Sequence, residues 1–177
     1  MPPSLTQQKL PSTPLSPAVE MVRVQTEDFD PGAELDALVT GHTDVGAAVS
    51  FVGYMRDHNE GRGVETLTLE HYPGMAEKAL SAIEEEAHRR WPLNASLIVH
   101  RVGPLQPSDR IVLVITTSAH RQAAFEAAEF LMDWLKTKAP FWKKETGPEG
   151  ETWVASRSTD ENAAQRWTAP PKSNLKP

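Results

Sequence analysis

The chain has 177 residues, with 18 Lys or Arg and 24 Asp or Glu, a formal net charge of −6, and no cysteine. The lack of cysteine excludes a disulfide-stapled scaffold, a Cys-ligated metal site and catalysis by a thiol of the chain itself. The acidic balance argues against a protein that mainly coats nucleic acid or an anionic membrane, because both require a dominant positive field. No apolar run approaches the roughly 20 residues that span a bilayer and no export signal is visible, so we expect a soluble, cytoplasmic protein.

Proline is concentrated at both ends of the sequence. Eight of the 15 prolines lie in the first 18 or the last ten residues, among Ser, Thr, Gln and Lys. Such segments bury too little apolar surface to offset the entropy lost on ordering. We therefore predict disordered tails at 1–18 and 169–177, around one domain at 19–168 with a single hydrophobic core.

The spacing of apolar residues predicts strands where they alternate and helices where they recur every three or four residues. The predicted elements are a strand over 19–24, a helix opened by Asp30-Pro31, a strand over 46–55, a turn at 59–63, a strand over 64–69, a helix over 73–91, strands over 96–102 and 110–116 joined by a turn region, a helix over 119–138, a hairpin of strands over 141–146 and 151–155, and a short helix near 160–167. Met75, Ala79, Ile83 and Ala87 mark the predicted buried side of the second helix. This order of elements favours an α+β domain with a largely antiparallel sheet and packed helices.

The predicted helix over 119–138 opens with a polar cluster. Thr117 or Ser118 is its predicted N-cap, and His120 and Arg121 follow in the first turn. Free backbone N–H groups, an imidazole and a guanidinium converge there, an arrangement suited to a phosphate because the donors and the helix dipole both favour an anion. A simple helix cap is the plain alternative.

A group of lysines lies at the other end of this helix and just beyond it. Residues 134–144 contain four lysines and no acidic residue, a local charge of +4 in a chain of net −6. This contrast favours an anion site, although lysines that complement a helix C-terminus and an exposed strand end are the usual explanation. The four are Lys136, Lys138, Lys143 and Lys144.

Strand alternation divides the aromatic and basic residues after this helix between two faces. Phe141 and Lys143 share one face, and Trp142 and Lys144 share the other. One aromatic ring is then expected in the core while one lysine points toward a pocket. Alternation alone leaves open which pair faces the pocket.

A third polar cluster, Arg56-Asp57-His58-Asn59, follows the predicted strand over 46–55. Binding residues often lie in such loops, and the plain alternative is a solvated strand end. The other histidines lack metal-type spacing, and no Gly-x-Ser-x-Gly motif supports a nucleophilic serine. We expect no metal ion and no cofactor. His100 is predicted to be a core or edge residue of its strand.

Five motifs, in order along 19–167, resemble the family of the large, catalytic subunit of molybdopterin synthase. They are Phe51-Val52-Gly53 with Arg56 to Asn59, Leu69 to Met75, His100 to Gly103, Ser118 to Arg121, and Leu135 to Glu145. Five blocks in the same order are far more specific than any one of them. The resemblance implies an α/β hammerhead-type fold and an enzyme, a sulfurtransferase of molybdenum cofactor biosynthesis.

The resemblance also implies an assembly and a reaction. A homodimer of large subunits, with a small ubiquitin-like subunit bound at each end, forms a heterotetramer. The small subunit carries sulfur as a C-terminal glycine thiocarboxylate, and two such sulfurs enter cyclic pyranopterin monophosphate in successive steps to give the dithiolene of molybdopterin. A sulfurtransferase without cysteine is consistent with this scheme, because the sulfur arrives on another chain.

Matching positions in the motifs imply residue roles. Lys136 resembles the central catalytic lysine beside the partner's thiocarboxylate, and Lys143 a second catalytic or substrate-orienting lysine. The positions that bind the pterin phosphate are matched by Arg56, His120 and Arg121. Those that flank the pocket are matched by Tyr54, Met55, Lys144 and Glu145, and the arginine that a neighbouring subunit supplies is matched by Arg157.

Helix geometry adds one expectation that does not depend on the resemblance to the family. Arg121 and Lys136 are fifteen residues apart in the predicted helix, which separates their Cα atoms by roughly 22 Å at about 1.5 Å per residue. They cannot both grip one small substrate, so we predict a composite pocket in which His120 and Arg121 of one subunit face Lys136 and Lys143 of the other.

Two other classes of function compete with the sulfurtransferase. A non-catalytic assembly subunit would keep the fold and the partner surface but would not need the charged residues of the pocket. All five are present, which argues against this class: Arg56, His120, Arg121, Lys136 and Lys143. An anion- or RNA-binding module built on Trp142 and the lysines conflicts with the net charge of −6 and the lack of a spread basic face. No nucleic acid or membrane partner is expected.

Overall fold

The computed structural model describes residues 21–155 and 158–168, so both predicted tails lie outside the described residues and the domain bounds remain a prediction. The elements are β1 (Val22–Gln25), α1 (Pro31–Val39), β2 (Ala47–Tyr54), β3 (His58–Asn59), β4 (Arg62–Gly63), β5 (Thr66–His71), α2 (Met75–Arg90), β6 (Leu93–Arg101), β7 (Gly103–Leu105), β8 (Arg110–Ser118), α3 (Arg121–Lys138), β9 (Phe141–Gly147), β10 (Gly150–Val154) and α4 (Ser158–Gln165). Every predicted helix and strand has a counterpart.

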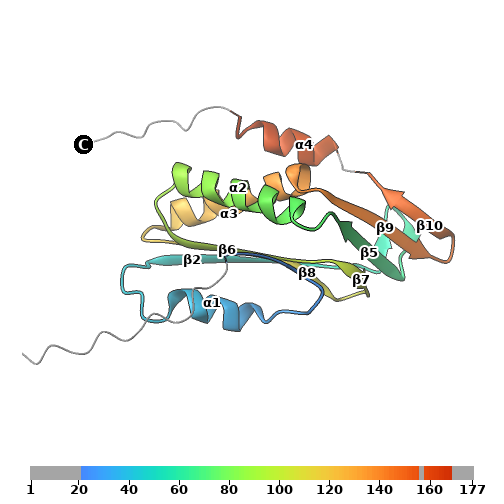
Figure 1. The fold of residues 1–177 in the computed structure, drawn as a ribbon, viewed down its shortest axis with the longest axis horizontal. Coiled ribbons are helices and arrows are strands. Elements are labelled where there is room, and N and C mark those ends of the chain that lie inside the picture. Colours follow the sequence, from blue (N-terminus) through green and yellow to red (C-terminus); the bar gives the residue numbers. More distant parts are fainter. Residues whose placement is uncertain (1–20, 156–157, 169–177) are drawn as a thin grey trace, which may run out of the picture.

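Two four-stranded sheets form the framework. The first has the order β1-β6-β8-β2 and the second the order β10-β9-β5-β7, while β3 and β4 form a separate two-stranded ribbon. Only the β1–β6 pair is parallel among the described strands, which agrees with the predicted antiparallel character. Helices α2 and α3 cover one face of the first sheet and α1 covers the other, while the second sheet extends from one end of the first (Figure 1).

The central strands of the first sheet are buried on both faces. Ile98 on β6 contacts the core beneath α2 and α3, where Phe130 of α3 is almost fully buried. Its neighbours Leu97 and Val99 point the other way and pack with Leu38 of α1. Burial on both faces explains why β6 and β8 read as nearly continuous apolar runs rather than as strict alternation.

Two details of the helices differ from the sequence prediction. Met75 is 53% exposed, because the buried stripe of α2 follows Ala76 and Leu80 and leaves the first residue of the helix at its flank. The N-cap of α3 is His120, so the prediction of Thr117 or Ser118 is wrong. Both of those residues are still paired in β8.

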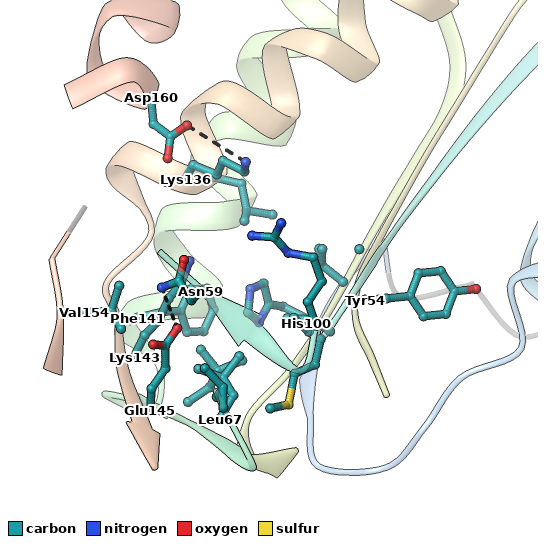
Figure 2. A pocket seen from close by; sticks show the side chains of 18 of the residues that line it. Tyr54, Asn59, Leu67, His100, Lys136, Phe141, Lys143, Glu145, Val154 and Asp160 are labelled. Carbon is teal, nitrogen blue, oxygen red and sulfur yellow. Dashed lines mark hydrogen bonds and ion pairs between the residues drawn. The ribbon is translucent and has the colours of Figure 1, made fainter. Parts of the chain in front are cut away.

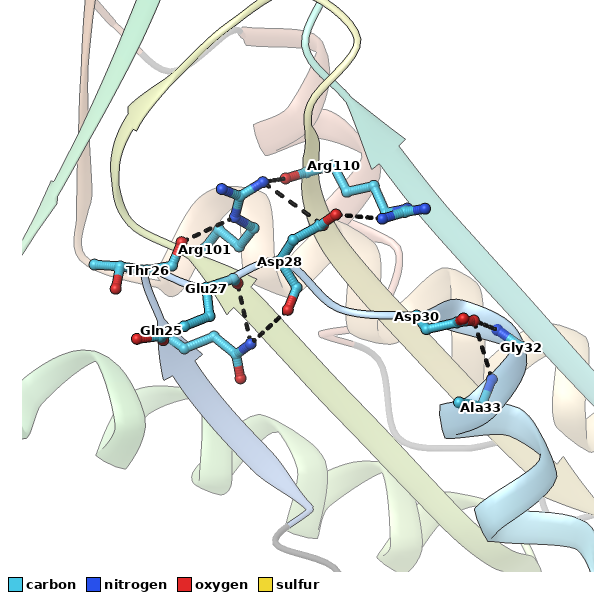
Figure 3. Close-up of polar contacts among 9 residues, drawn as sticks. All are labelled: Gln25, Thr26, Glu27, Asp28, Asp30, Gly32, Ala33, Arg101 and Arg110. Atoms are coloured by element: carbon cyan, nitrogen blue, oxygen red, sulfur yellow. Dashed lines mark hydrogen bonds and ion pairs between the residues drawn. The ribbon is translucent and has the colours of Figure 1, made fainter.

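The loop between β1 and α1 is fixed by polar contacts (Figure 3). The carboxylate of Asp28 forms ion pairs with Arg101 and Arg110, which lie on neighbouring strands of the first sheet. Asp30 then caps α1, accepting hydrogen bonds from the backbone N–H groups of Gly32 at 2.8 Å and Ala33 at 3.1 Å. This confirms the predicted start of the helix at Asp30-Pro31.

Candidate functional site

A pocket of about 530 Å³ lies where the two sheets meet the C-terminal end of α3. Its volume is within the range of roughly 300–1,000 Å³ that is typical of small-molecule sites. Side chains from both sheets, α3 and α4 converge on it (Figure 2). Those that carry polar or aromatic groups include Arg56, Asn59, His100, Lys136, Phe141, Lys143, Glu145 and Asp160.

Lys136 reaches the pocket from the last turn of α3. Its side chain is 47% exposed, and its Nζ lies 3.9 Å from Oδ1 of Asp160 on α4 (Figure 2). Lys138, two residues later, instead places its Nζ 5.3 Å from the ring of Trp134 and does not line the pocket. Helical spacing therefore separates these two lysines although they are close in the sequence.

Strand β9 places its side chains alternately inside and outside the pocket. Phe141 and Lys143 line it, together with Glu145. Trp142 is 50% exposed, and Lys144 pairs with a carboxylate of β10 at 3.4 Å on the face that does not line the pocket. The alternative that the sequence left open is thereby resolved in favour of Phe141 and Lys143, while Lys144 does not flank the pocket.

The last residue of β2 and the two residues after it line the pocket. A register shift between Gly53 and Tyr54 interrupts pairing with β8, as in a β-bulge, which re-aims the residues that follow. Met55 is buried in the pocket wall and Arg56 also lines the pocket. The ring of Tyr54 points away from the pocket in Figure 2, so its contribution to the lining comes from the rest of the residue.

The β3–β4 ribbon closes one side of the pocket through Asn59. Its Nδ2 donates a hydrogen bond of 2.8 Å to Oε1 of Glu145, which joins the ribbon to β9 (Figure 2). The backbones also approach closely nearby, since a Cβ atom on Gly147 would lie 2.2 Å from the carbonyl oxygen of Gly63. Asn59 is a pocket residue to which sequence reasoning gave no role of its own, although it belongs to the third polar cluster.

His100 forms part of the pocket wall and is only 3% exposed. Its Nδ1 donates to the backbone carbonyl of Arg101 at 2.8 Å, and its ring stacks on Phe141 with centroids 3.9 Å apart and planes 10° apart. Burial lowers the pKa of His100 from 6.5 to about 4, and the positive charges of Lys143 and His71 add to this effect. The ring is therefore neutral near pH 7.

The prediction of a buried strand histidine is confirmed for His100, but its place in the pocket was missed. The usable signal was its position at the start of the His100 to Gly103 motif.

The predicted phosphate-binding residues His120 and Arg121 lie at the opposite end of α3 and do not line this pocket. Both are exposed. Arg157 lies outside the described residues. One chain therefore brings together six of the ten predicted site residues: Lys136, Lys143, Arg56, Tyr54, Met55 and Glu145.

Two features are absent from the described residues, 21–155 and 158–168. No group of three or more His, Cys, Asp or Glu side chains is arranged to hold a metal ion there. No helix among these same residues is both long and apolar enough to cross a membrane.

The model of the family described as MoaE protein matches residues 24–138. The chain belongs to the MoaE family. The molybdopterin synthase catalytic subunit of Pseudomonas aeruginosa is 58% identical over 146 residues, which cover 82% of this chain and 97% of that protein. The sequence-based assignment to the catalytic subunit of molybdopterin synthase, an enzyme of molybdenum cofactor biosynthesis, is thus confirmed.

Solved structures of this family share the fold. The molybdopterin biosynthesis MoaE protein from Burkholderia ambifaria has a TM-score of 0.72 and 53% identity, covering 85% of this chain and 99% of its own. A complex of subunits 1 and 2 of molybdopterin-converting factor from Helicobacter pylori contains a chain with a TM-score of 0.65, covering 78% of this chain and 92% of its own. At 18% identity that second likeness shows the fold alone. Together they confirm the predicted α+β class.

Proposed function

We propose that this MoaE chain inserts sulfur into cyclic pyranopterin monophosphate in the cytoplasm, taking the sulfur from the C-terminal glycine thiocarboxylate of a small ubiquitin-like subunit. One observation carries the proposal: a pocket that gathers Arg56, Lys136 and Lys143 in a chain that has no cysteine. Guanidinium and ammonium groups suit a phosphate substrate, and the missing thiol has to be replaced by sulfur from a partner.

The pocket cations support two tasks in such a transfer. One is to neutralise the phosphate of the substrate, for which the fork of Arg56 suits two phosphate oxygens at once. The other is the task assigned to Lys136. Once the sulfur has bonded to the substrate, water adds to the glycine carbonyl carbon, and the lysine stabilises the oxyanion that forms before the C–S bond breaks and the glycine leaves as a carboxylate. Lys143 enters the same pocket from β9, so it can orient the substrate against Lys136.

The test compares Lys136→Ala and Lys143→Ala with the matched control Lys138→Ala, which removes a lysine from the same turn of α3 outside the pocket. Each variant is mixed with thiocarboxylated small subunit and cyclic pyranopterin monophosphate, and molybdopterin is quantified. We expect losses of about a hundredfold or more for the two pocket lysines and near wild-type yield for the control. Wild-type yield from Lys136→Ala, with the fold intact by circular dichroism, would contradict the assignment.

The remaining phosphate-binding residues support a site shared between two copies of the chain. Arg121 and Lys136 are separated by roughly 22 Å along α3, at about 1.5 Å per residue. We propose that His120 and Arg121, with Arg157, complete the pocket of the other subunit in a homodimer that carries one small subunit at each end.

Mixing two inactive variants tests the shared site. A heterodimer of Lys136→Ala with Arg121→Ala has one pocket that lacks both residues and one pocket that lacks neither. We expect activity to return when the two variants are unfolded and refolded together. Two variants that stay inactive after mixing, although heterodimers form, would mean that each pocket takes both residues from the same chain.

The RNA-binding alternative fits the structure less well than the anion pocket. Lys143 and Lys144 lie on opposite faces of β9, and Lys136 points toward Asp160, so these lysines do not form one basic surface. A nucleic-acid site requires such a surface along the phosphate backbone.

A further inference from the structure

We propose that His100 is a positioning residue of the pocket: its imidazole holds Phe141 at the start of β9 and so sets where Lys143 stands relative to Lys136. The proposal rests on the proposed function, because it concerns the geometry of the two lysines assigned to sulfur transfer. It gives a role to a buried histidine that the mechanism above does not use.

The stack lies at the corner that separates the two lysines. Lys136 is in the last turn of α3, and the chain turns through Ala139 before β9 begins at Phe141, whose backbone N–H donates to the carbonyl of Ala139 at 2.9 Å. The Phe141 ring is the first side chain after the corner that packs against the core beneath α2 and α3. Fixing this ring therefore fixes the corner and, two residues on, the side of β9 from which Lys143 projects.

The ring of His100 is itself fixed in place. It sits on β6, in the middle of the first sheet, where it pairs with Val112 of β8. Its Nδ1–H bond to the carbonyl of Arg101 sets the ring plane, and that plane is nearly parallel to Phe141. The stack thus ties the first sheet to the first residue of a strand in the second sheet.

A neutral ring is also the suitable neighbour for a catalytic lysine. The groups that act on His100 electrostatically are Lys143 and His71, both positive when protonated. Because His100 is buried and uncharged near pH 7, it adds no repulsion that would push the Lys143 ammonium group away. A phenylalanine at position 100 would also be neutral and flat. It would lose only the hydrogen bond to the backbone carbonyl of Arg101.

Three variants separate the stack from the hydrogen bond. His100→Phe keeps an aromatic ring against Phe141, and His100→Asn keeps a donor for the Arg101 carbonyl but removes the ring. His71→Asn is the matched control, since its ring lies 6.4 Å from Phe141 at a tilt of 37° and is not stacked. Each is assayed for kcat and for KM toward cyclic pyranopterin monophosphate, with thermal melting as the measure of folding.

We expect His100→Asn to lower kcat about 10- to 100-fold with little change in KM, because displacing a positioned group by about 1 Å has effects of this size. His100→Phe should recover kcat to within about threefold of wild type, and His71→Asn should match wild type. If His100→Asn folds and keeps wild-type kcat, or if His100→Phe is as impaired as His100→Asn, the stack does not position the lysine and the proposal is overturned.

A double-mutant comparison shows whether His100 acts through Lys143. In a Lys143→Ala background, His100→Asn should cause no further loss of the residual single-turnover rate, although it should still lower the melting temperature. An additional loss of the same size as in wild type overturns the proposal. If Lys143→Ala and Lys136→Ala are themselves fully active, the proposed function has failed; if they are impaired while His100→Asn is not, only the positioning role has failed.

Discussion

His100 should make the folded chain sensitive to acid well above the pH at which carboxylates titrate. Its pKa is lowered from 6.5 to about 4 because burial disfavours the charged imidazole. Between these two values the unfolded chain binds a proton at His100 and the folded chain does not. Stability therefore rises with pH across this window, and it is lost as the pH falls from about 6.5 toward about 4.

The size of this effect follows from the same two values. At about 1.36 kcal/mol for each pH unit, the difference between 6.5 and about 4 amounts to roughly 3.4 kcal/mol, all of it lost by about pH 4. At about pH 5, roughly 2 kcal/mol is already lost relative to neutral pH. Against a typical unfolding free energy of about 5–15 kcal/mol, such a loss is readily measured.

Urea unfolding at about pH 7 and about pH 5 tests this reasoning in wild type and His100→Phe. Wild type should lose roughly 2 kcal/mol more than the variant between the two conditions, since phenylalanine cannot take up a proton. Carboxylates with lowered pKa, such as Asp57, are present in both proteins and cancel in the comparison. His42→Gln, which removes an exposed imidazole, is the control and should follow wild type. Equal pH dependence in wild type and His100→Phe would refute the argument.

Three further substitutions test a close backbone contact beside the pocket, the N-cap of α1 and the packing of the core. Gly147→Ala should destabilise the chain by about 1–3 kcal/mol in urea unfolding, because the new Cβ would lie 2.2 Å from the carbonyl oxygen of Gly63; an unchanged midpoint would show that the backbones separate freely. Asp30→Ala should cost about 1 kcal/mol by removing the N-cap of α1, with Asp36→Ala on the same helix as a neutral control; equal effects would rule out a special role for the cap. Phe130→Ala should cost about 3–5 kcal/mol by leaving a cavity in the core, and a loss below about 1 kcal/mol would mean that the core collapses to fill it.

The elements that sequence reasoning placed correctly are those whose local pattern matches their burial. Helix α3 was predicted over 119–138, and it has a buried stripe through Ala124, Ala128, Leu131 and Leu135 that matches helical spacing. The strand over 103–105 was instead expected to be part of a turn. Three residues are too few to show a period, and β7 exists because it pairs with β5, which lies more than thirty residues earlier.

The same distinction holds in the pocket. Lys136 and Lys143 were predicted because they stand out as a local charge cluster, and the motifs of the family cover them. The bond from Asn59 to Glu145 joins residues 86 positions apart, and His100 stacks on a ring 41 positions later. Neither contact leaves a local pattern, because each side chain alone reads as an ordinary strand residue. Such positions become predictable only once it is known how β9 lies relative to β6 and to the β3–β4 ribbon.

The pocket can attract an anion although the whole chain has a net charge of −6. Its lining combines the cations Arg56, Lys136 and Lys143 with the carboxylates Glu145 and Asp160. Glu145 accepts a hydrogen bond from a neutral amide, and Asp160 lies 3.9 Å from Lys136, whose side chain is 47% exposed. An ion pair of this kind is worth at most about 1 kcal/mol, less than a desolvated contact between an ammonium group and a phosphate. An entering anion can therefore take Lys136 from Asp160 at little cost, so the acidic α4 can hold the lysine in place without blocking its use.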